Sequence, residues 1–241
     1  KNDTSEKNVE QTIKKLVASG APLTVQLTIT RNGTAQMIES IERIADLGVL
    51  YIKIEPVHHS VLSRGTQSLV PNIEEFIEMF LSSLKWIVTH DLHAKIDSSF
   101  ISRPTSGYYC GAGEGSNITV TPTGLITSCL EVARMSDAYA NTMIYGQCNE
   151  DGSVIIDSQK RQFLDRLHWR NYQNCPECNL KLICGGGCPM QNGWDNDDLM
   201  SPSEYTCHAH QMLLPKIFTM VFESPRIIDV IFDNHTVVKQ C

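Results

Sequence analysis

The start of the chain alternates between helical and extended hydrophobic patterns. Apolar residues three and four positions apart predict a helix that runs to about Ser19 and ends at Gly20. Apolar and polar positions then alternate strictly over residues 23–30, which predicts a strand. A second amphipathic helix stops at Gly48, and residues 50–57 predict a second strand.

Strand, helix and strand in this order predict a βαβ unit with parallel strands and a right-handed crossover. The first strand has one apolar face and one polar face. Because the strands of a parallel sheet are usually covered on both faces, the polar face predicts a sheet that lines a ligand-filled lumen, as in a barrel.

A longer helix is predicted after Asn72, which is placed as its N-cap with Glu75 three positions later. A short strand near residues 94–97 and a linker around residues 98–106 complete the first region. The predicted buried stripe of the helix consists of Ile73, Phe76, Ile77, Phe80, Leu81, Leu84 and Val88.

Short strands, turns and cysteines replace long helices in the second region. Residues 118–128 predict a β-hairpin whose turn has Pro at its second position and Gly at its fourth, which places Cys110 and Cys129 near each other. A second hairpin is predicted to turn at residues 149–152, and a helix across residues 163–167 follows it.

Composition narrows the function classes. The net charge of −7 provides no basic surface for phosphates, so a nucleic-acid partner is not expected. The sequence has neither an apolar run long enough to cross a bilayer nor a secretion signal at its start, so we expect a cytoplasmic protein and no membrane partner. In that reducing setting, nine cysteines favour metal ligation over disulfides.

The densest cysteine cluster reads C-P-E-C-N-L-K-L-I-C-G-G-G-C from Cys175 to Cys188. The pairs Cys175-x2-Cys178 and Cys184-x3-Cys188 have the spacing of metal ligands on tight loops. We interpret the glycines between Cys184 and Cys188 as flexibility for wrapping a metal group. A structural zinc site of Cys175, Cys178, Cys184 and Cys207 is the alternative to an iron–sulfur cluster.

The full pattern is Cys110-x13-Gly124-x4-Cys129, then the dense cluster, then Cys207, and it resembles the SPASM domain of radical S-adenosylmethionine peptide-modifying enzymes. Residues 24–30 and 50–57 resemble the fifth and sixth strands of the partial barrel in that family. The resemblance implies an α/β fold in which the remnant of a partial (β/α)6 radical SAM barrel precedes an α+β SPASM iron–sulfur domain with short β-hairpins. The expected domains are 1–98 for the barrel part, 99–210 for the SPASM domain and 211–241 for a C-terminal extension.

Two auxiliary [4Fe-4S] clusters are implied by this resemblance. The first would take Cys110, Cys129 and Cys188, and its fourth iron either binds a substrate group or is closed by Cys148, for which a buried thiol without such a role is the alternative. Relatives that mature sulfatases carry a cysteine where this chain has Ser116 and an aspartate base where it has Leu130, so that activity is disfavoured. The second cluster would take Cys175, Cys178, Cys184 and Cys207.

Radical SAM chemistry also needs a C-x3-C-x2-C motif, and none occurs before Cys110. We therefore expect the chain to be the C-terminal part of a longer enzyme, whose front would hold S-adenosylmethionine and a third [4Fe-4S] cluster. Thr28, Thr30 and Glu55 are expected to face that cofactor, with polar lumen residues that do not touch it as the alternative. His58 and His59 follow the second strand, where catalytic groups collect in βα folds, but we favour the interpretation that they are ordinary loop histidines.

The expected function is modification of a ribosomally made precursor peptide by crosslink or thioether formation, with an external electron donor. The alternative is a zinc- or iron–sulfur-binding module that binds a peptide or transfers electrons without radical chemistry of its own. The sequence does not specify the peptide or the bond formed.

Overall fold

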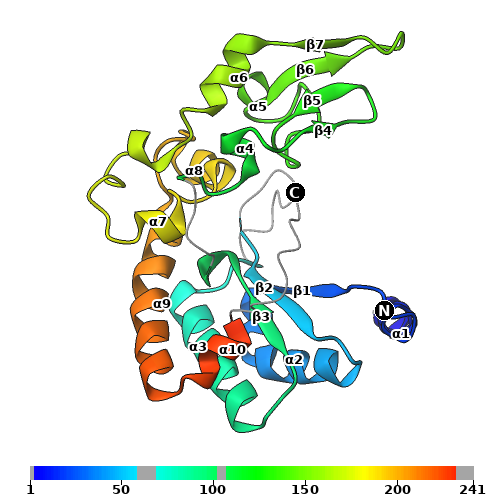
Figure 1. Ribbon diagram of the computed structural model, residues 1–241, viewed down its shortest axis with the longest axis vertical. Coiled ribbons are helices and arrows are strands. Elements are labelled where there is room, and N and C mark those ends of the chain that lie inside the picture. Colours follow the sequence, from blue (N-terminus) through cyan, green and yellow to red (C-terminus); the bar gives the residue numbers. More distant parts are fainter. Residues whose placement is uncertain (1–2, 59–68, 102–106, 232–241) are drawn as a thin grey trace. The chain divides into compact units, whose positions relative to one another are not determined.

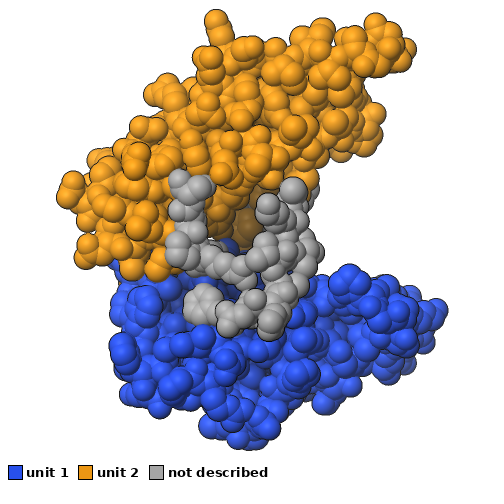
Figure 2. Space-filling view, viewed as in Figure 1, with its two compact units in different colours: residues 1–57, 68–102, 209–237 blue, residues 58–67, 103–208, 238–241 orange. Residues whose placement is uncertain are grey.

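A computed structural model of the chain describes residues 3–58, 69–101 and 107–231 (Figure 1). Within these ranges it is a mixed α/β chain with a parallel sheet of order β1-β2-β3 and an antiparallel sheet of order β4-β5-β6-β7. Contacts divide it into two compact units (Figure 2). The first comprises residues 1–57, 68–102 and 209–237, and the second comprises residues 58–67, 103–208 and 238–241.

The beginning of the first unit confirms the predicted βαβ arrangement. Strands β1 and β2 are parallel, with Thr24 opposite Tyr51 and Ile29 opposite Pro56. On β2 the side chains of Ile52 and Ile54 are fully buried, whereas Lys53 between them is partly exposed. The elements are α1 (Asp3–Ala18), β1 (Thr24–Ile29), η1 (Arg31–Gln36), α2 (Met37–Asp46) and β2 (Tyr51–Pro56).

Helix α3 (Ile73–Thr89) carries most of the aromatic core of the first unit. Asn72 caps it as predicted, because the side-chain oxygen of Asn72 accepts a hydrogen bond of 2.9 Å from the Glu75 N–H. The ring of Phe76 lies 6.0 Å from that of Phe80. The predicted stripe is wrong at its end, since Ile87 rather than Val88 is buried there. Strand β3 (Lys95–Asp97), parallel to β2, and η3 (Ser99–Ile101) follow.

Helices α9 (Glu204–Glu223) and α10 (Arg226–Ile231) were not predicted. Pro215 lies inside α9, and proline is normally a helix breaker, so the sequence pattern concealed this helix. Helix α10 contacts α3 and β3 of the first unit (Figure 1). The Lys95 ammonium donates a hydrogen bond to the Asp229 carbonyl.

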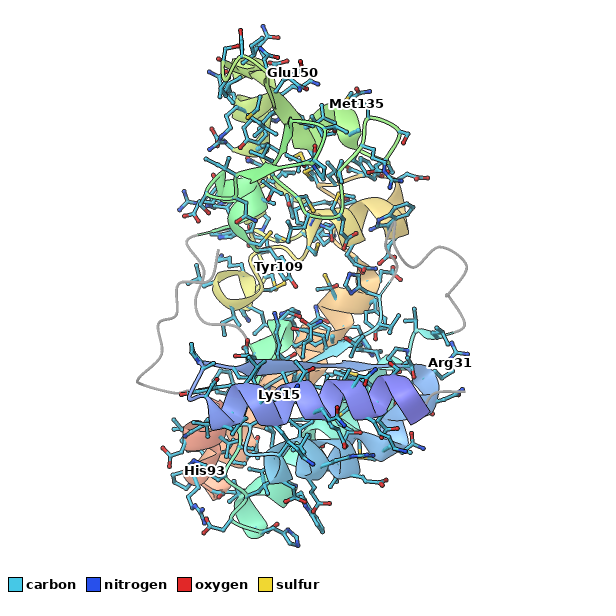
Figure 3. All side chains as sticks on the ribbon, turned by 90° about the vertical axis from the view of Figure 1, so that its right-hand side faces the viewer. Lys15, Arg31, His93, Tyr109, Met135 and Glu150 are labelled. Carbon is cyan, nitrogen blue, oxygen red and sulfur yellow. The ribbon has the colours of Figure 1, made fainter. Side chains whose placement is uncertain are left out.

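Short elements build the second unit around two confirmed hairpin turns. The Gly124 N–H donates to the Thr121 carbonyl at 2.9 Å, and the Gly152 N–H donates to the Asn149 carbonyl at 3.0 Å. Met135 and Glu150 are exposed loop residues of this unit (Figure 3). Its strands are β4 (Thr119–Val120), β5 (Leu125–Thr127), β6 (Ile144–Cys148) and β7 (Val154–Ile156), and its helices are α4 (Gly111–Glu114), α5 (Ala140–Met143), α6 (Ser158–Leu164), η4 (Trp169–Asn171), α7 (Lys181–Cys184) and α8 (Pro189–Asn196).

Side chains from these strands, helices and connecting turns form the hydrophobic core of the second unit. Met143, Leu164 and Met190 are almost completely buried in it. Leu167, which we predicted to lie in a helix, falls beyond the end of α6 but is still buried in the same core. The helix is therefore shorter than its apolar pattern indicated, and the buried position is retained by the turn that follows.

Replacing Phe80 with Ala is expected to destabilise the first unit by about 3–5 kcal/mol, because Phe80 is fully buried and its truncation leaves a cavity. Glu78→Ala on the exposed side of α3 is the matched control and should change stability by about 0.5 kcal/mol or less. Urea unfolding followed by circular dichroism measures both. Equal midpoints for the two variants would contradict the assigned core.

Candidate metal centre

Four cysteines of the second unit interact electrostatically with one another, and we call them the loop group (Cys175, Cys178, Cys184 and Cys207). Cys175 interacts with Cys178 and Cys207, and Cys184 interacts with Cys175 and Cys207. The Cys178 N–H donates to the Cys175 carbonyl at 3.0 Å, which makes the tight turn that the x2 spacing predicts. Cys184 ends α7, and Cys207 lies on α9.

Three other cysteines form a second set, the hairpin group (Cys110, Cys129 and Cys188). Cys129 interacts electrostatically with Cys110, and Cys188 interacts with both. Cys188 is the N-cap of α8, four positions after Cys184 in the sequence. The charge interactions thus divide the seven thiols in the same way as the expected ligand sets, although the identity of any bound metal group stays a prediction.

Burial dominates the chemistry of these thiols. Desolvation raises the pKa values of Cys129, Cys184 and Cys188 to about 12 and that of Cys175 to about 11, and neighbouring thiols add to the effect. Cys110 is exposed as a residue, yet burial of its sulfur also raises its pKa. Since metals bind thiolates, binding of a cation here must displace protons.

The cysteines are donors of the right chemical kind for an iron–sulfur group, because thiolates are the usual protein ligands of such clusters. Within the described residues, no group of three or more His, Cys, Asp or Glu side chains is arranged so that it could hold a metal ion. A cluster at these thiols therefore stays a prediction. In the same part of the chain, a buried carboxylate oxygen of Glu131 lacks a hydrogen-bond partner, and Glu131 interacts with Cys129 and Cys188.

The three glycines before Cys188 serve close packing rather than flexibility alone. Gly185, Gly186 and Gly187 all have positive φ angles, of 64°, 89° and 78°. A Cβ atom on Gly186 would lie 2.6 Å from the ring of Tyr172. These backbone conformations let the chain reverse between Cys184 and Cys188, so that neighbouring cysteines join different groups.

Tyr172 contacts this reversal and is electrostatically linked to both groups. Burial raises its pKa, and smaller contributions come from Cys110, Cys188 and Cys175. The Tyr172 hydroxyl donates to the Leu167 carbonyl at 3.3 Å. Sequence analysis did not single out this residue, because nothing in the local pattern marks it.

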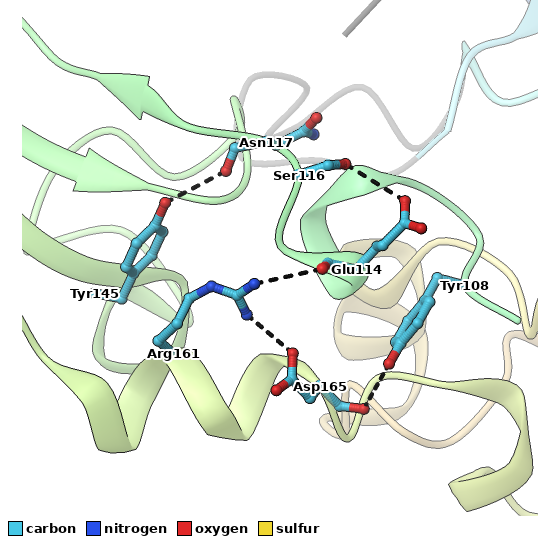
Figure 4. A network of polar contacts seen from close by, with 7 residues as sticks. All are labelled: Tyr108, Glu114, Ser116, Asn117, Tyr145, Arg161 and Asp165. Carbon is cyan, nitrogen blue, oxygen red and sulfur yellow. Dashed lines mark hydrogen bonds and ion pairs between the residues drawn. The ribbon is translucent and has the colours of Figure 1, made fainter. Parts of the chain in front are cut away.

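A polar network holds the segment that begins with Cys110 (Figure 4). Arg161 on α6 pairs with Asp165 at 3.0 Å and donates to the Glu114 carbonyl at 3.4 Å. Tyr108 donates to the Asp165 carbonyl at 3.1 Å. The Ser116 hydroxyl lies 3.5 Å from the Glu114 carboxylate.

The residues expected to face a cofactor lie in the first unit. Thr28 and Glu55 are register partners on β1 and β2. The Thr30 hydroxyl caps η1 by accepting from the Gly33 N–H at 3.2 Å. Glu55 accepts hydrogen bonds of 2.7 Å from both the N–H and the hydroxyl of Ser99, and burial raises the pKa of its carboxyl. Thr30 and Glu55 thus already have hydrogen-bond partners within the protein, and the contact of Thr28, Thr30 and Glu55 with a cofactor stays a prediction.

Comparison with known proteins finds a similar fold at low sequence identity. No family model matches the chain, and no curated protein matches it. The solved structure titled "Native anSMEcpe with bound AdoMet" is similar over 94% of this chain, with a TM-score of 0.57 and 12% sequence identity. This chain spans 61% of the length of that one. Across the described residues, none of the helices has the length and apolar character to cross a membrane.

Gly186→Ala is expected to destabilise the second unit more than Gly152→Ala. Both glycines have positive φ, so each substitution costs about 1–2 kcal/mol of backbone strain. Only Gly186 also faces a ring, which adds about 1–3 kcal/mol of overpacking, whereas nothing lies within 4 Å of a Cβ at Gly152. Chemical unfolding of the metal-free chain measures the difference in stability. Equal losses of stability in the two variants would show that packing against the Tyr172 ring adds no cost at Gly186.

The metal-free chain should lose stability as pH rises from about 9 towards 12. Burial raises the thiol pKa values of Cys129, Cys184 and Cys188 from 9 to about 12, so in this window the folded chain keeps protons that the unfolded chain releases. Urea midpoints at pH 8, 9 and 10 under reducing conditions test this. The C129A/C184A/C188A variant should show a shallower decline, and an identical slope would argue against the buried thiols as its cause.

Proposed function

We propose that this chain forms the auxiliary-cluster part of a radical SAM enzyme that modifies a ribosomally made peptide. The observation that carries the proposal is the division of seven cysteines, at the spacing of a SPASM domain, into groups of three and four interacting thiols. The fold likeness to a structure with bound AdoMet supports it.

In this proposal, Cys175, Cys178, Cys184 and Cys207 hold one [4Fe-4S] cluster, and Cys110, Cys129 and Cys188 hold another. When bound, such clusters supply electron transfer or an iron that polarises a substrate group. The thiols themselves provide a desolvated pocket in which their own pKa values are raised. Bound iron reverses that preference, because it favours the thiolate over the thiol.

Radical generation would belong to a segment outside residues 1–241, since AdoMet and its cluster require a C-x3-C-x2-C motif that these residues lack. The parallel sheet with Thr28 and Glu55, together with Thr30 directly after β1, would then border the AdoMet site. The substrate would be a precursor peptide, joined by a crosslink or thioether, with an external protein as electron donor.

Anaerobic reconstitution with iron and sulfide tests the cluster assignment. The wild-type chain should bind about eight iron and eight sulfide atoms, and Cys184→Ala should keep about half of them in the hairpin group. Ser116→Ala is the matched control and should keep the full content, because Ser116 bonds within its own turn. A colourless protein that contains two zinc ions would defeat the proposal.

A further inference from the structure

The hairpin group has three thiols, and a carboxylate lies beside it. Glu131 follows Cys129 by two positions, and its backbone N–H donates to the Cys129 sulfur. Its carboxylate interacts electrostatically with Cys129 and with Cys188, which comes from the distant N-terminus of α8. Two of the three thiols therefore share one acidic neighbour.

The two oxygens of this carboxylate have different surroundings. Oε1 lies 3.4 Å from Nε2 of His58, whose side chain is about half exposed. Oε2 is buried and has no hydrogen-bond partner among the described residues. A buried oxygen without a partner is unfavourable, and such groups in proteins normally have one.

A three-thiol group leaves one iron of a [4Fe-4S] cluster without a protein ligand. Two other candidates are Cys148 and Ser116. Cys148 belongs to β6, and its thiol is not among the groups that interact with Cys129 or Cys188. The Ser116 hydroxyl faces Glu114.

We infer that Oε2 of Glu131 is the fourth protein ligand of the cluster in the hairpin group. The inference rests on the proposed function, because it requires that cluster. Ligation is a donation of a carboxylate electron pair to the remaining iron and involves no redox step. The contact of His58 is with Oε1, which leaves Oε2 for the iron.

The test uses the Cys184→Ala background, in which the hairpin group alone is expected to hold a cluster. Cyanide is the probe, because it binds an iron that lacks a protein ligand and changes the electron paramagnetic resonance spectrum of the reduced cluster. The background protein should be insensitive to cyanide. Adding Glu131→Gln, which keeps the shape but not the charge, should make it sensitive, whereas adding Cys148→Ala should not.

The outcomes are distinct. Cyanide sensitivity in the background protein would show that the iron is already open and would overturn the inference. Sensitivity caused by Cys148→Ala but not by Glu131→Gln would overturn it in favour of Cys148. A background protein that binds no iron would instead reject the proposed function.

Misfolding is separated from ligand loss by the metal-free proteins. Glu131→Gln should unfold at a urea midpoint close to that of its background. If it does not, Glu131→Asp is used in place of Glu131→Gln. The shorter carboxylate should give a spectrum between that of the background protein and that of its Glu131→Gln variant. A Glu131→Asp spectrum identical to the background in position and cyanide response would count against ligation, since a ligand drawn back by one methylene must change the iron site.

Discussion

The second unit buries several cysteine sulfur atoms close to one another, and this burial determines whether their thiols can ionise. Burial disfavours the thiolate, and each neighbouring thiol disfavours it further, so the pKa values of Cys129, Cys184 and Cys188 reach about 12. Such a cluster of donors is inert as a set of thiols. A metal ion placed among them would reverse this preference, because it favours the thiolate over the thiol.

Two sets of donors arise from one short stretch because the backbone turns sharply inside it. Gly185, Gly186 and Gly187 adopt positive φ, and the ring of Tyr172 packs where a Cβ of Gly186 would be. Cys184 consequently interacts with Cys175 and Cys207, whereas Cys188 interacts with Cys110 and Cys129. Cysteines of both groups contribute to the raised pKa of Tyr172, so this side chain lies near both groups.

Charge near the hairpin group is distributed unevenly. Glu131 adds a negative group beside thiols that already resist ionisation, which would be an unfavourable choice for a site of thiols alone. A cationic metal group turns the same carboxylate into a favourable neighbour. In the parallel sheet, by contrast, Glu55 is satisfied by two hydrogen bonds from Ser99, so its buried carboxylate is already accounted for within the protein.

The sequence alone determined what depends on near neighbours along the chain. The alternation of residues 24–29, the Asn72 cap and the turns at Gly124 and Gly152 are set by side-chain periodicity and backbone preference, and each appears in the structure. The cysteine spacing also predicts a metal site, which stays a prediction.

Only the tertiary structure decided which distant groups meet. Helix α9 was hidden because Pro215 interrupts its pattern, and packing against the rest of the first unit overrides that local preference. Glu131 carried no signal of its own, since its significance comes from Cys188 and His58, which lie far from it in the sequence. Electrostatic interaction and burial act through space, and a linear pattern records them only where the chain returns to the same place within a few residues.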